Sequence, residues 1–312
     1  MREVETMLND GLIFSESRMA YEQELIEDLA AFDLKSSNGV FKGGPVLFRK
    51  DNICYTDGSD IHDLIIGDTG SMKTLKFVLP LIYSCAMANE SMVIVDPKGE
   101  LVRKSGTFLE KRGYKKIVLN WRRPQESPDH WNPFERVQNA YDNGESGKDD
   151  SENYLNDLLQ SLFFGRTEKG KDPYWNELSG QIARGICKQI LKIGEKLSMK
   201  SILEWRHTKM KDGTLQNCFL ALPTDSDIYQ DLAGFMNLTA ENTRTCIEST
   251  FDQLTSLFTA SKALTEMMSD TSFKVENIGK EKTAIFLVVP DEKTTYHFLA
   301  TLFITQCYES LL

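Results

Sequence analysis

The chain has 312 residues, of which 41% are hydrophobic and 26% are charged, and its formal net charge at pH 7 is −10. This length supports one large domain or two ordinary ones, and the acidic charge excludes a protein whose whole surface wraps nucleic acid. The six cysteines form no C-x-x-C pair and no histidine stands at metal-ligand spacing, so we expect reduced thiols in a cytosolic protein and no zinc site.

The longest apolar stretch runs from Phe77 to Ala88, contains Pro80 and is too short to span a bilayer. The first 30 residues are acidic and carry no apolar run, which argues against a signal peptide. We therefore expect a soluble, cytoplasmic chain that reaches the cytoplasmic face of a membrane only through partners.

The first 60 residues are predicted to form a helix and short strands that lead into the core. Ser17 to Phe32 has the pattern of a surface helix, with Leu25, Ile26 and Leu29 on one face. Glycines and a proline between residues 36 and 60 separate short apolar runs, which is typical of turns between small strands.

Residues 63–120 alternate between strand-like and helix-like patterns. Leu64–Ile66, Met92–Val95 and Ile117–Leu119 are short continuous apolar runs, as expected for a parallel sheet covered on both faces. The stretches between them, at about 74–89 and 100–112, are long enough for crossover helices.

Beyond residue 137 the pattern changes to helices and then returns to a strand. Residues 138–152 are polar and acidic and are predicted to be a boundary loop. Asp172 and Pro173 suit a helix start, and another helix follows Thr239. Three apolar stripes mark core-facing helices: Tyr154, Leu155, Leu158, Leu159, Leu162 and Phe163; Trp175, Leu178, Ile182, Ile186 and Ile190; and Ile247, Phe251, Leu254 and Phe258.

Ala284–Val289 is predicted to be a buried strand, followed by a helix over about 294–310. The economical organisation is an α/β domain formed by residues 61–145 and 268–312, with an all-α domain, residues 150–265, inserted into it.

The stretch Gly67-Asp68-Thr69-Gly70-Ser71-Met72-Lys73-Thr74 nearly matches the phosphate-loop pattern G-x-x-x-x-G-K-[ST]. Gly67 and Gly70 allow the backbone to curl around phosphates. Lys73 neutralises phosphate charge, and Thr74 coordinates Mg²⁺ at the start of a helix whose dipole favours an anion.

Met72 departs from this pattern because it stands where a glycine is expected. A left-handed conformation costs a methionine about 1–2 kcal/mol. Two interpretations are open: a phosphate loop in which Gly70 supplies the flexibility, or a glycine turn with a solvated Lys73.

A second candidate, Asp96, follows the predicted strand Met92–Val95 in the sequence Asp-Pro-Lys-Gly-Glu. The carboxyl end of a parallel strand is where open α/β sheets bind ligands. The alternative is that Asp96 only forms a turn and caps the next helix.

These stretches together resemble a known family. "GDTGSMKT", "SMVIVDPKGEL", "GYKKIVLN" and "HWNPFE" occur in the order and approximate spacing of the conjugative coupling proteins, the TraG/TraD-like ATPases of type IV secretion systems. "DPYWNEL" and "AIFLVVPDEKTTYHFL" extend the resemblance over about residues 60–312.

The resemblance implies a RecA-like P-loop ATPase domain with an inserted all-α domain, a hexameric ring, and export of single-stranded DNA with its bound relaxase through the secretion channel. The implied cofactors are ATP and Mg²⁺, with Thr74 and Asp96 nearest the metal. Matching the family's motifs are Gly67, Gly70, Ser71, Lys73 and Thr74 in the phosphate loop, with Asp68, Thr69 and Met72 completing it, and Asp96 and Glu100 in the DPKGE motif.

The chain departs from the family at Met72 and in having no N-terminal membrane helices. We also expect it to be cut short, because Leu312 precedes the family's Walker B strand and its Asp-Glu pair. The catalytic acid is therefore unidentified. Glu292, in "FLVVPDE", is the one substitute, although Pro290 interrupts the pattern and a simple turn is the alternative.

Residues 98–123 hold nine Lys or Arg against two acids, which suits either a DNA or subunit contact or a solvated helix end. Arg122 and Arg123 are candidates for action at a neighbouring subunit's nucleotide. The acidic helical region suits a basic protein cargo better than DNA. Two other functions stay open: a non-catalytic docking module with a decayed loop, and a chromosome pump like FtsK.

Overall fold

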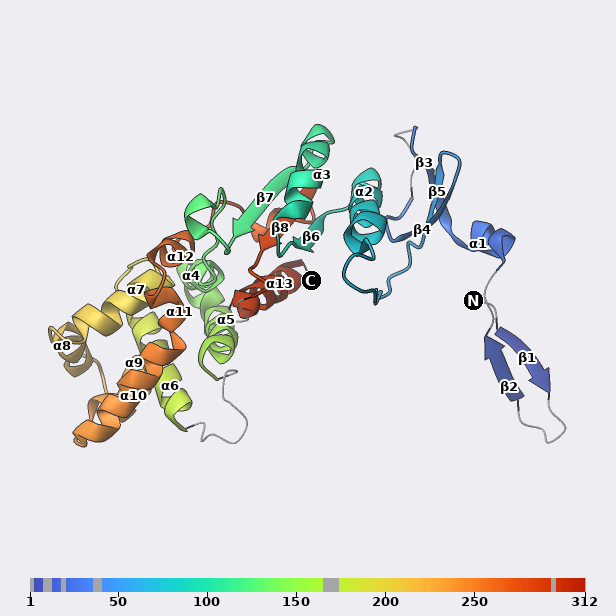
Figure 1. Cartoon of the computed structure of the whole chain (residues 1–312). Coiled ribbons are helices and arrows are strands. Elements are labelled where there is room, and N and C mark those ends of the chain that lie inside the picture. Colours follow the sequence, from blue (N-terminus) through green and yellow to red (C-terminus); the bar gives the residue numbers. More distant parts are fainter. Residues whose placement is uncertain are drawn as a thin grey trace. The chain divides into compact units, whose positions relative to one another are not determined.

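The computed structural model describes residues 3–7, 13–17, 21–35, 41–164, 174–292 and 296–311 (Figure 1). The chain divides into two compact units. The first comprises Met1–Met92, Leu101–Lys116 and Gly279–Ala284, and the second comprises Val93–Glu100, Ile117–Ile278 and Ile285–Leu312. The division into a nucleotide-binding domain and an inserted helical domain stays a prediction.

The first unit begins with short antiparallel strands. β1 (Glu3–Met7) pairs with β2 (Ile13–Ser17), and a second sheet has the order β3-β5-β4. The predicted helix over Ser17–Phe32 is shorter than expected, because Phe32 is buried in strand β3 and Ser17 ends β2. The remaining bounds are α1 (Glu22–Asp28), β3 (Ala30–Asp33), β4 (Val46–Lys50) and β5 (Ile53–Thr56).

The predicted strand Leu64–Ile66 is wrong. These residues have no regular secondary structure, and the side chains of Leu64 and Ile66 are 83% and 85% exposed. A strand needs a neighbour for its backbone N–H and C=O groups, and no described strand pairs with this segment. The apolar run predicted a buried strand, but hydrophobicity carries no information about a pairing partner, and these residues are neither paired nor buried.

The central sheet has the order β6-β8-β7 and is parallel. Lys115 N–H donates to the Lys282 carbonyl, and Arg122 N–H donates to the Val288 carbonyl. Because the residue numbers of both partners increase together, β7 and β8 are parallel. β8 lies in the middle and all its residues are buried. The predicted strands are therefore confirmed as β6 (Met92–Val95), β7 (Lys115–Asn120) and β8 (Thr283–Val288).

Both predicted helices are present, but only the second joins two strands of the sheet. The helix after the glycine-containing loop starts as a π-helical turn, η1 (Thr74–Val78), and continues as α2 (Leu79–Met87). Between β6 and β7 the chain forms α3 (Glu100–Lys111), whose buried face includes Leu101 and Leu109.

The boundary loop predicted for residues 138–152 is wrong. The segment contains the end of α4 (Glu135–Asp142), the 3₁₀ turn Gly144–Gly147 and the start of α5 (Lys148–Leu159). Its polar residues form the solvent side of amphipathic helices, and Asp149 and Asp150 stabilise the first turn of α5 through the helix dipole.

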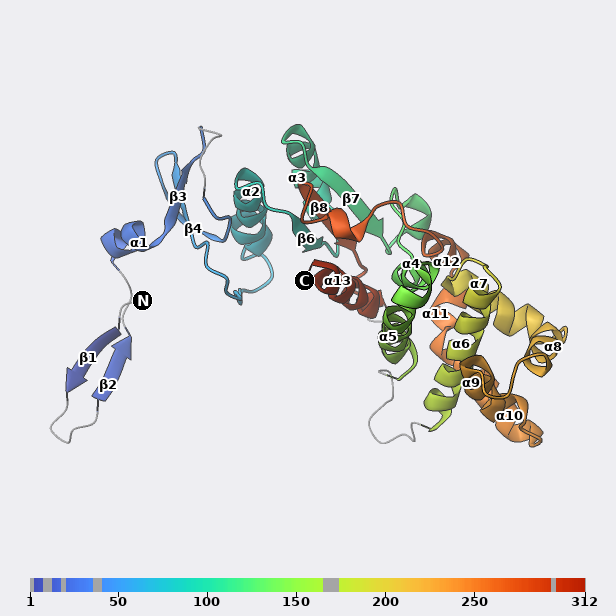
Figure 2. The ribbon, with the colours of Figure 1, turned by 180° about the vertical axis from the view of Figure 1, so that it is seen from behind.

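Residues 148–267 of the described chain are helical, without strands (Figure 2). The apolar stripes face one common core, in which α6 packs against α9 and α10. The helix start predicted at Asp172-Pro173 lies outside the described residues. The helices are α6 (Tyr174–Lys192), α7 (Met199–Glu204), α8 (Thr214–Leu220), α9 (Asp227–Met236), α10 (Glu241–Leu254), α11 (Ser256–Thr259) and α12 (Lys262–Met267).

The chain then returns to β8 and to α13 (His297–Leu311), as predicted. The buried Trp131 ring contacts Phe303 of α13 edge to face at 5.1 Å. None of the helices in the described ranges combines the length and the apolar composition that a bilayer crossing requires.

Asn132, in the "HWNPFE" stretch, joins two parts of the second unit. Its side-chain amide donates to the Leu197 carbonyl at 2.8 Å, and its side-chain oxygen accepts from Phe134 N–H at 3.1 Å. The side chain is buried, so each of these partners depends on Asn132 and not on water.

We expect Asn132→Ala to lower the free energy of unfolding by about 2–3 kcal/mol, because it leaves buried backbone groups without partners. Urea unfolding followed by circular dichroism measures this change. Asn139→Ala, at an exposed position of α4, is the control and should change stability by less than about 0.5 kcal/mol. Equal effects of the two substitutions would contradict the assigned role of Asn132.

Candidate functional site

The loop of residues 67–71 closes on itself through one backbone turn. Ser71 N–H donates to the Asp68 carbonyl at 3.1 Å. Gly70 has a φ of +87°, and no atom lies within 4 Å of the position that its Cβ would take. At Gly67 a Cβ would lie 2.6 Å from the Ser71 hydroxyl oxygen. Gly70 therefore provides a left-handed backbone conformation, whereas Gly67 allows the Ser71 side chain to approach the backbone closely.

The Lys73 ammonium lies over this loop. Its Nζ donates to the carbonyl of Gly67 and to that of Asp68, the latter at 3.1 Å. Thr74 follows directly as the first residue of η1, and Lys76 N–H donates to the Met72 carbonyl at 2.8 Å. A glycine-containing turn, a lysine folded over it and a helix start are thus adjacent, which is the arrangement that binds phosphate groups in P-loop proteins.

The backbone conformation of Met72 shows how a methionine fits at the position where the motif has a glycine. Its φ is +63°, the left-handed conformation that a glycine would adopt, and its side chain is 56% exposed. Gly70 therefore does not replace the missing glycine, because both residues are left-handed. Residue 72 thus keeps the backbone conformation expected of a glycine, and Met72 carries a strain of about 1–2 kcal/mol.

A second group of candidate residues lies at the end of β6. Asp96 is 1% exposed, and its N–H donates to the Leu287 carbonyl of β8 at 2.9 Å. Gly99 N–H donates to the Asp96 carbonyl at 3.1 Å, and Gly99 has a φ of +66°. Asp96 therefore ends the strand in a tight turn, and Glu100 begins α3. Turn formation and ligand binding are compatible roles for this residue.

Arg122 joins three segments at the carboxyl end of the sheet. Besides its backbone bond to Val288, its guanidinium donates to the Pro97 carbonyl at 3.0 Å and to the Glu292 carboxylate at 2.9 Å. Sequence reasoning considered Arg122 for a DNA or subunit contact, for a solvated helix end and for a neighbouring subunit's nucleotide, and did not find these contacts. Arg122 and Glu292 each follow an apolar run by a few residues, but only the pairing of β7 with β8 shows that these two runs are neighbours.

Other members of the basic cluster also have partners within the chain. Arg112 Nε donates to the Ala86 carbonyl at 3.1 Å, Lys116 pairs with Glu110 at 2.6 Å, and Arg123 pairs with Glu126 at 3.3 Å. These local pairs reduce the charge that the cluster presents to DNA.

A parallel α/β sheet, together with a glycine-containing loop that ends in Lys-Thr at a helix start, defines the P-loop class of α/β folds. Within that class, the family model described as "Type IV secretory system Conjugative DNA transfer" matches residues 9–312, and the chain belongs to this family. The resemblance stated from the motifs is therefore confirmed. The comparison with curated proteins found no match.

Solved structures of a plasmid coupling protein share the fold, which confirms the α/β class. TrwB in complex with the non-hydrolysable ATP analogue ADPNP is 18% identical, with a TM-score of 0.52 over 77% of this chain and 50% of that chain. TrwB in complex with ADP and Mg²⁺ is 20% identical, with a TM-score of 0.50 over 78% of this chain and 50% of that chain. The chain thus spans about half the length of these structures.

The left-handed conformation of Met72 is testable by substitution. We expect Met72→Val to lower the free energy of unfolding by about 1–2 kcal/mol, because a β-branched side chain is poorly tolerated at positive φ. Met72→Gly should stay within about 1 kcal/mol of the parent chain, since relief of strain offsets the entropy of a more flexible unfolded chain.

Denaturant unfolding measures both variants. Leu75→Val is the matched control, because Leu75 is similarly exposed but right-handed in η1, and it should cost less than about 0.7 kcal/mol. If Met72→Val were as stable as Leu75→Val, the left-handed conformation at residue 72 would be wrong.

Proposed function

We propose that this chain is the nucleotide-binding part of a coupling-protein ATPase that drives conjugative transfer of single-stranded DNA, with its relaxase, through a type IV secretion system. The observation that carries the proposal is the left-handed backbone at Met72, with Lys73 folded over the loop, in a member of the conjugative transfer family. A decayed phosphate loop would have no need to keep this strained conformation.

The residues of the loop suit a nucleoside triphosphate. In this proposal the Lys73 ammonium leaves the carbonyls of Gly67 and Asp68 and neutralises phosphate charge. The backbone N–H groups of Gly70 and of residues 72–74 donate to phosphate oxygens, because Gly70 and Met72 both turn the chain through left-handed positions. The Thr74 hydroxyl holds Mg²⁺, whose chemistry is to neutralise charge between the phosphates.

We assign the role of the acidic residue that helps to hold Mg²⁺ to Asp96, not to Glu292. Asp96 is buried, and its backbone N–H bond to Leu287 of β8 fixes the residue within its own unit. Glu292 is exposed, follows Pro290 and is neutralised by Arg122. Arg122 is in this view a positioning residue for the Asp96-Pro97 turn. The acid that activates water for hydrolysis remains unassigned among the described residues.

The partners follow from the family and from charge. We propose single-stranded DNA, a relaxase and components of the secretion channel as partners, a hexameric ring as the working assembly, and the cytoplasmic face of the membrane as its place. The acidic helical region favours a basic protein cargo as its contact.

Binding of nucleotide is the direct test. We expect the chain to bind Mg-ATP in titration calorimetry and Lys73→Ala to weaken that binding by at least about 100-fold, because a charge-assisted contact to phosphate is lost. Lys76→Ala, which removes an exposed lysine one turn along the same helix, is the control and should leave affinity within about twofold.

Absence of nucleotide binding by the parent chain would overturn the proposal and favour a docking module instead. Equal losses in Lys73→Ala and Lys76→Ala would also count against it, since a general charge effect would then explain the result.

Substitutions of Asp96 and Glu292 are distinguished by how each changes the effect of Mg²⁺ on ATP affinity. We expect Asp96→Asn to abolish most of the increase in ATP affinity that Mg²⁺ produces, and Glu292→Gln to preserve it. The measurement is the ratio of dissociation constants for ATP with Mg²⁺ and with EDTA. The opposite pattern would identify Glu292 as the metal-ordering acid.

A further inference from the structure

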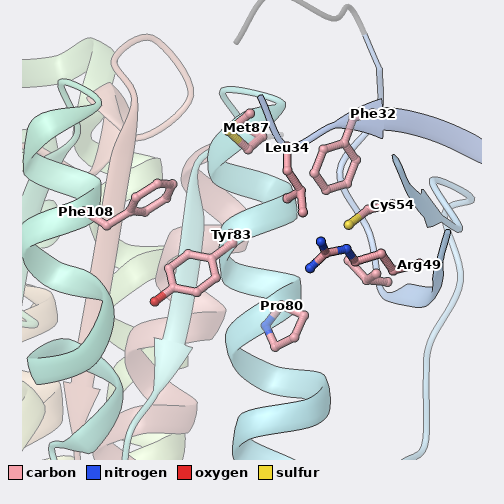
Figure 3. A pocket seen from close by; sticks show the side chains of 9 residues that line it. Phe32, Leu34, Arg49, Cys54, Pro80, Tyr83, Met87 and Phe108 are labelled. Atoms are coloured by element: carbon pink, nitrogen blue, oxygen red, sulfur yellow. The ribbon is translucent and has the colours of Figure 1, made fainter. Parts of the chain in front are cut away.

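The first unit contains a cavity that the proposed function does not use. It lies between the sheet β3-β5-β4 and the helices α2 and α3, and has a volume of about 480 Å³ (Figure 3). Binding sites for small molecules usually have volumes of about 300–1,000 Å³ and a mostly apolar lining. The cavity is therefore large enough for a small organic ligand.

Aromatic side chains form opposite walls of the cavity. On the sheet side, the buried Phe32 ring stacks on Phe41 with a centroid distance of 4.6 Å. On the helix side, the Tyr83 ring meets Phe108 edge to face at 4.8 Å, and the Tyr83 hydroxyl donates to the Lys104 carbonyl. Each wall is thus held by a second ring, and the polar end of Tyr83 already has an acceptor.

The remaining interior is also apolar in character. Met87 lines the helix side, and Cys54 is buried on the sheet side. Burial raises the pKa of the Cys54 thiol, so it stays neutral near pH 7 and behaves as a small apolar group. An apolar chain in this cavity contacts rings, a thioether and a thiol.

One charged residue, Arg49, is found among the described residues of the lining, and no carboxylate accompanies it there. Arg49 is exposed, its Nε donates to the Asp51 carbonyl, and its guanidinium extends into the space between the sheet and α2 (Figure 3). The terminal nitrogens of a guanidinium match a carboxylate in a bidentate geometry. The cavity thus combines an apolar interior with a cation where it meets solvent.

We propose that this cavity binds a single-chain anionic amphiphile, with its carboxylate at Arg49 and its apolar chain between the Phe32 wall and the Tyr83–Phe108 wall. The volume accommodates a chain on the order of ten carbons, since a methylene group takes roughly the 30 Å³ share of a water molecule and part of the space lies open to solvent.

The charge requirement is tested with three ligands of equal chain length: decanoate, decanol and decyltrimethylammonium, each below its micelle concentration. In titration calorimetry at low salt we expect decanoate to bind about fivefold more tightly than decanol, because the pair with an exposed arginine is partly screened. The ammonium compound should bind more weakly than decanol.

Arg49→Gln should abolish the difference between decanoate and decanol, whereas Lys50→Gln should preserve it. Lys50 is adjacent, exposed and paired with Glu22, so it controls for general charge. Circular dichroism verifies that both variants are folded. A difference that survives in Arg49→Gln would overturn the assignment of the head group.

The location is tested by chain length and by filling the cavity. From hexanoate to decanoate we expect affinity to rise about fourfold per methylene group, and Met87→Trp should lower decanoate affinity by at least about tenfold because the ring occupies the same space. Unchanged affinity in folded Met87→Trp, or no binding of decanoate by the parent chain, would overturn the proposal.

Discussion

The placement of the candidate residues depends on the backbone hydrogen bonds of β8. This strand is buried along its whole length and lies between β6 and β7. Its Leu287 carbonyl accepts from Asp96, and its Val288 carbonyl accepts from Arg122. Because these bonds are made by consecutive residues of one rigid strand, they bring the ends of two other strands to the same level, and the Arg122 side chain then reaches Pro97 and Glu292.

The candidate phosphate loop depends on a different constraint, the left-handed backbone at Gly70 and Met72. A methionine satisfies this constraint at a cost of about 1–2 kcal/mol. Its side chain lies largely in solvent, so the cost is conformational and no packing is lost. The loop thus preserves the path of its backbone while changing the residue that usually permits it.

The strands β6, β7 and β8 were predictable because short continuous apolar runs are typical of parallel strands. Burial along the whole strand holds for β8, whereas Val93 and Val95 of β6 are exposed. Leu64–Ile66 has the same pattern and failed, because hydrophobicity does not specify which strand pairs with it. Residues 138–152 failed for the opposite reason: polar residues indicated a loop, yet they form the outer side of α4 and α5. The phosphate loop stays a prediction from its motif, whereas the Arg122–Glu292 pair requires the register of parallel strands, which no local pattern contains.

The order of strands also has a consequence for how the chain folds. β6 and β7 are close in sequence but do not pair with each other, because β8, about 190 residues further along, lies between them. During synthesis, both strands therefore wait with unpaired edges until the whole helical region has left the ribosome. Such long-range pairing makes folding slow and exposes apolar edges to aggregation. The helices between β7 and β8 share one core, in which α6 packs against α9 and α10. They can form before β8 and leave closure of the sheet as the late step.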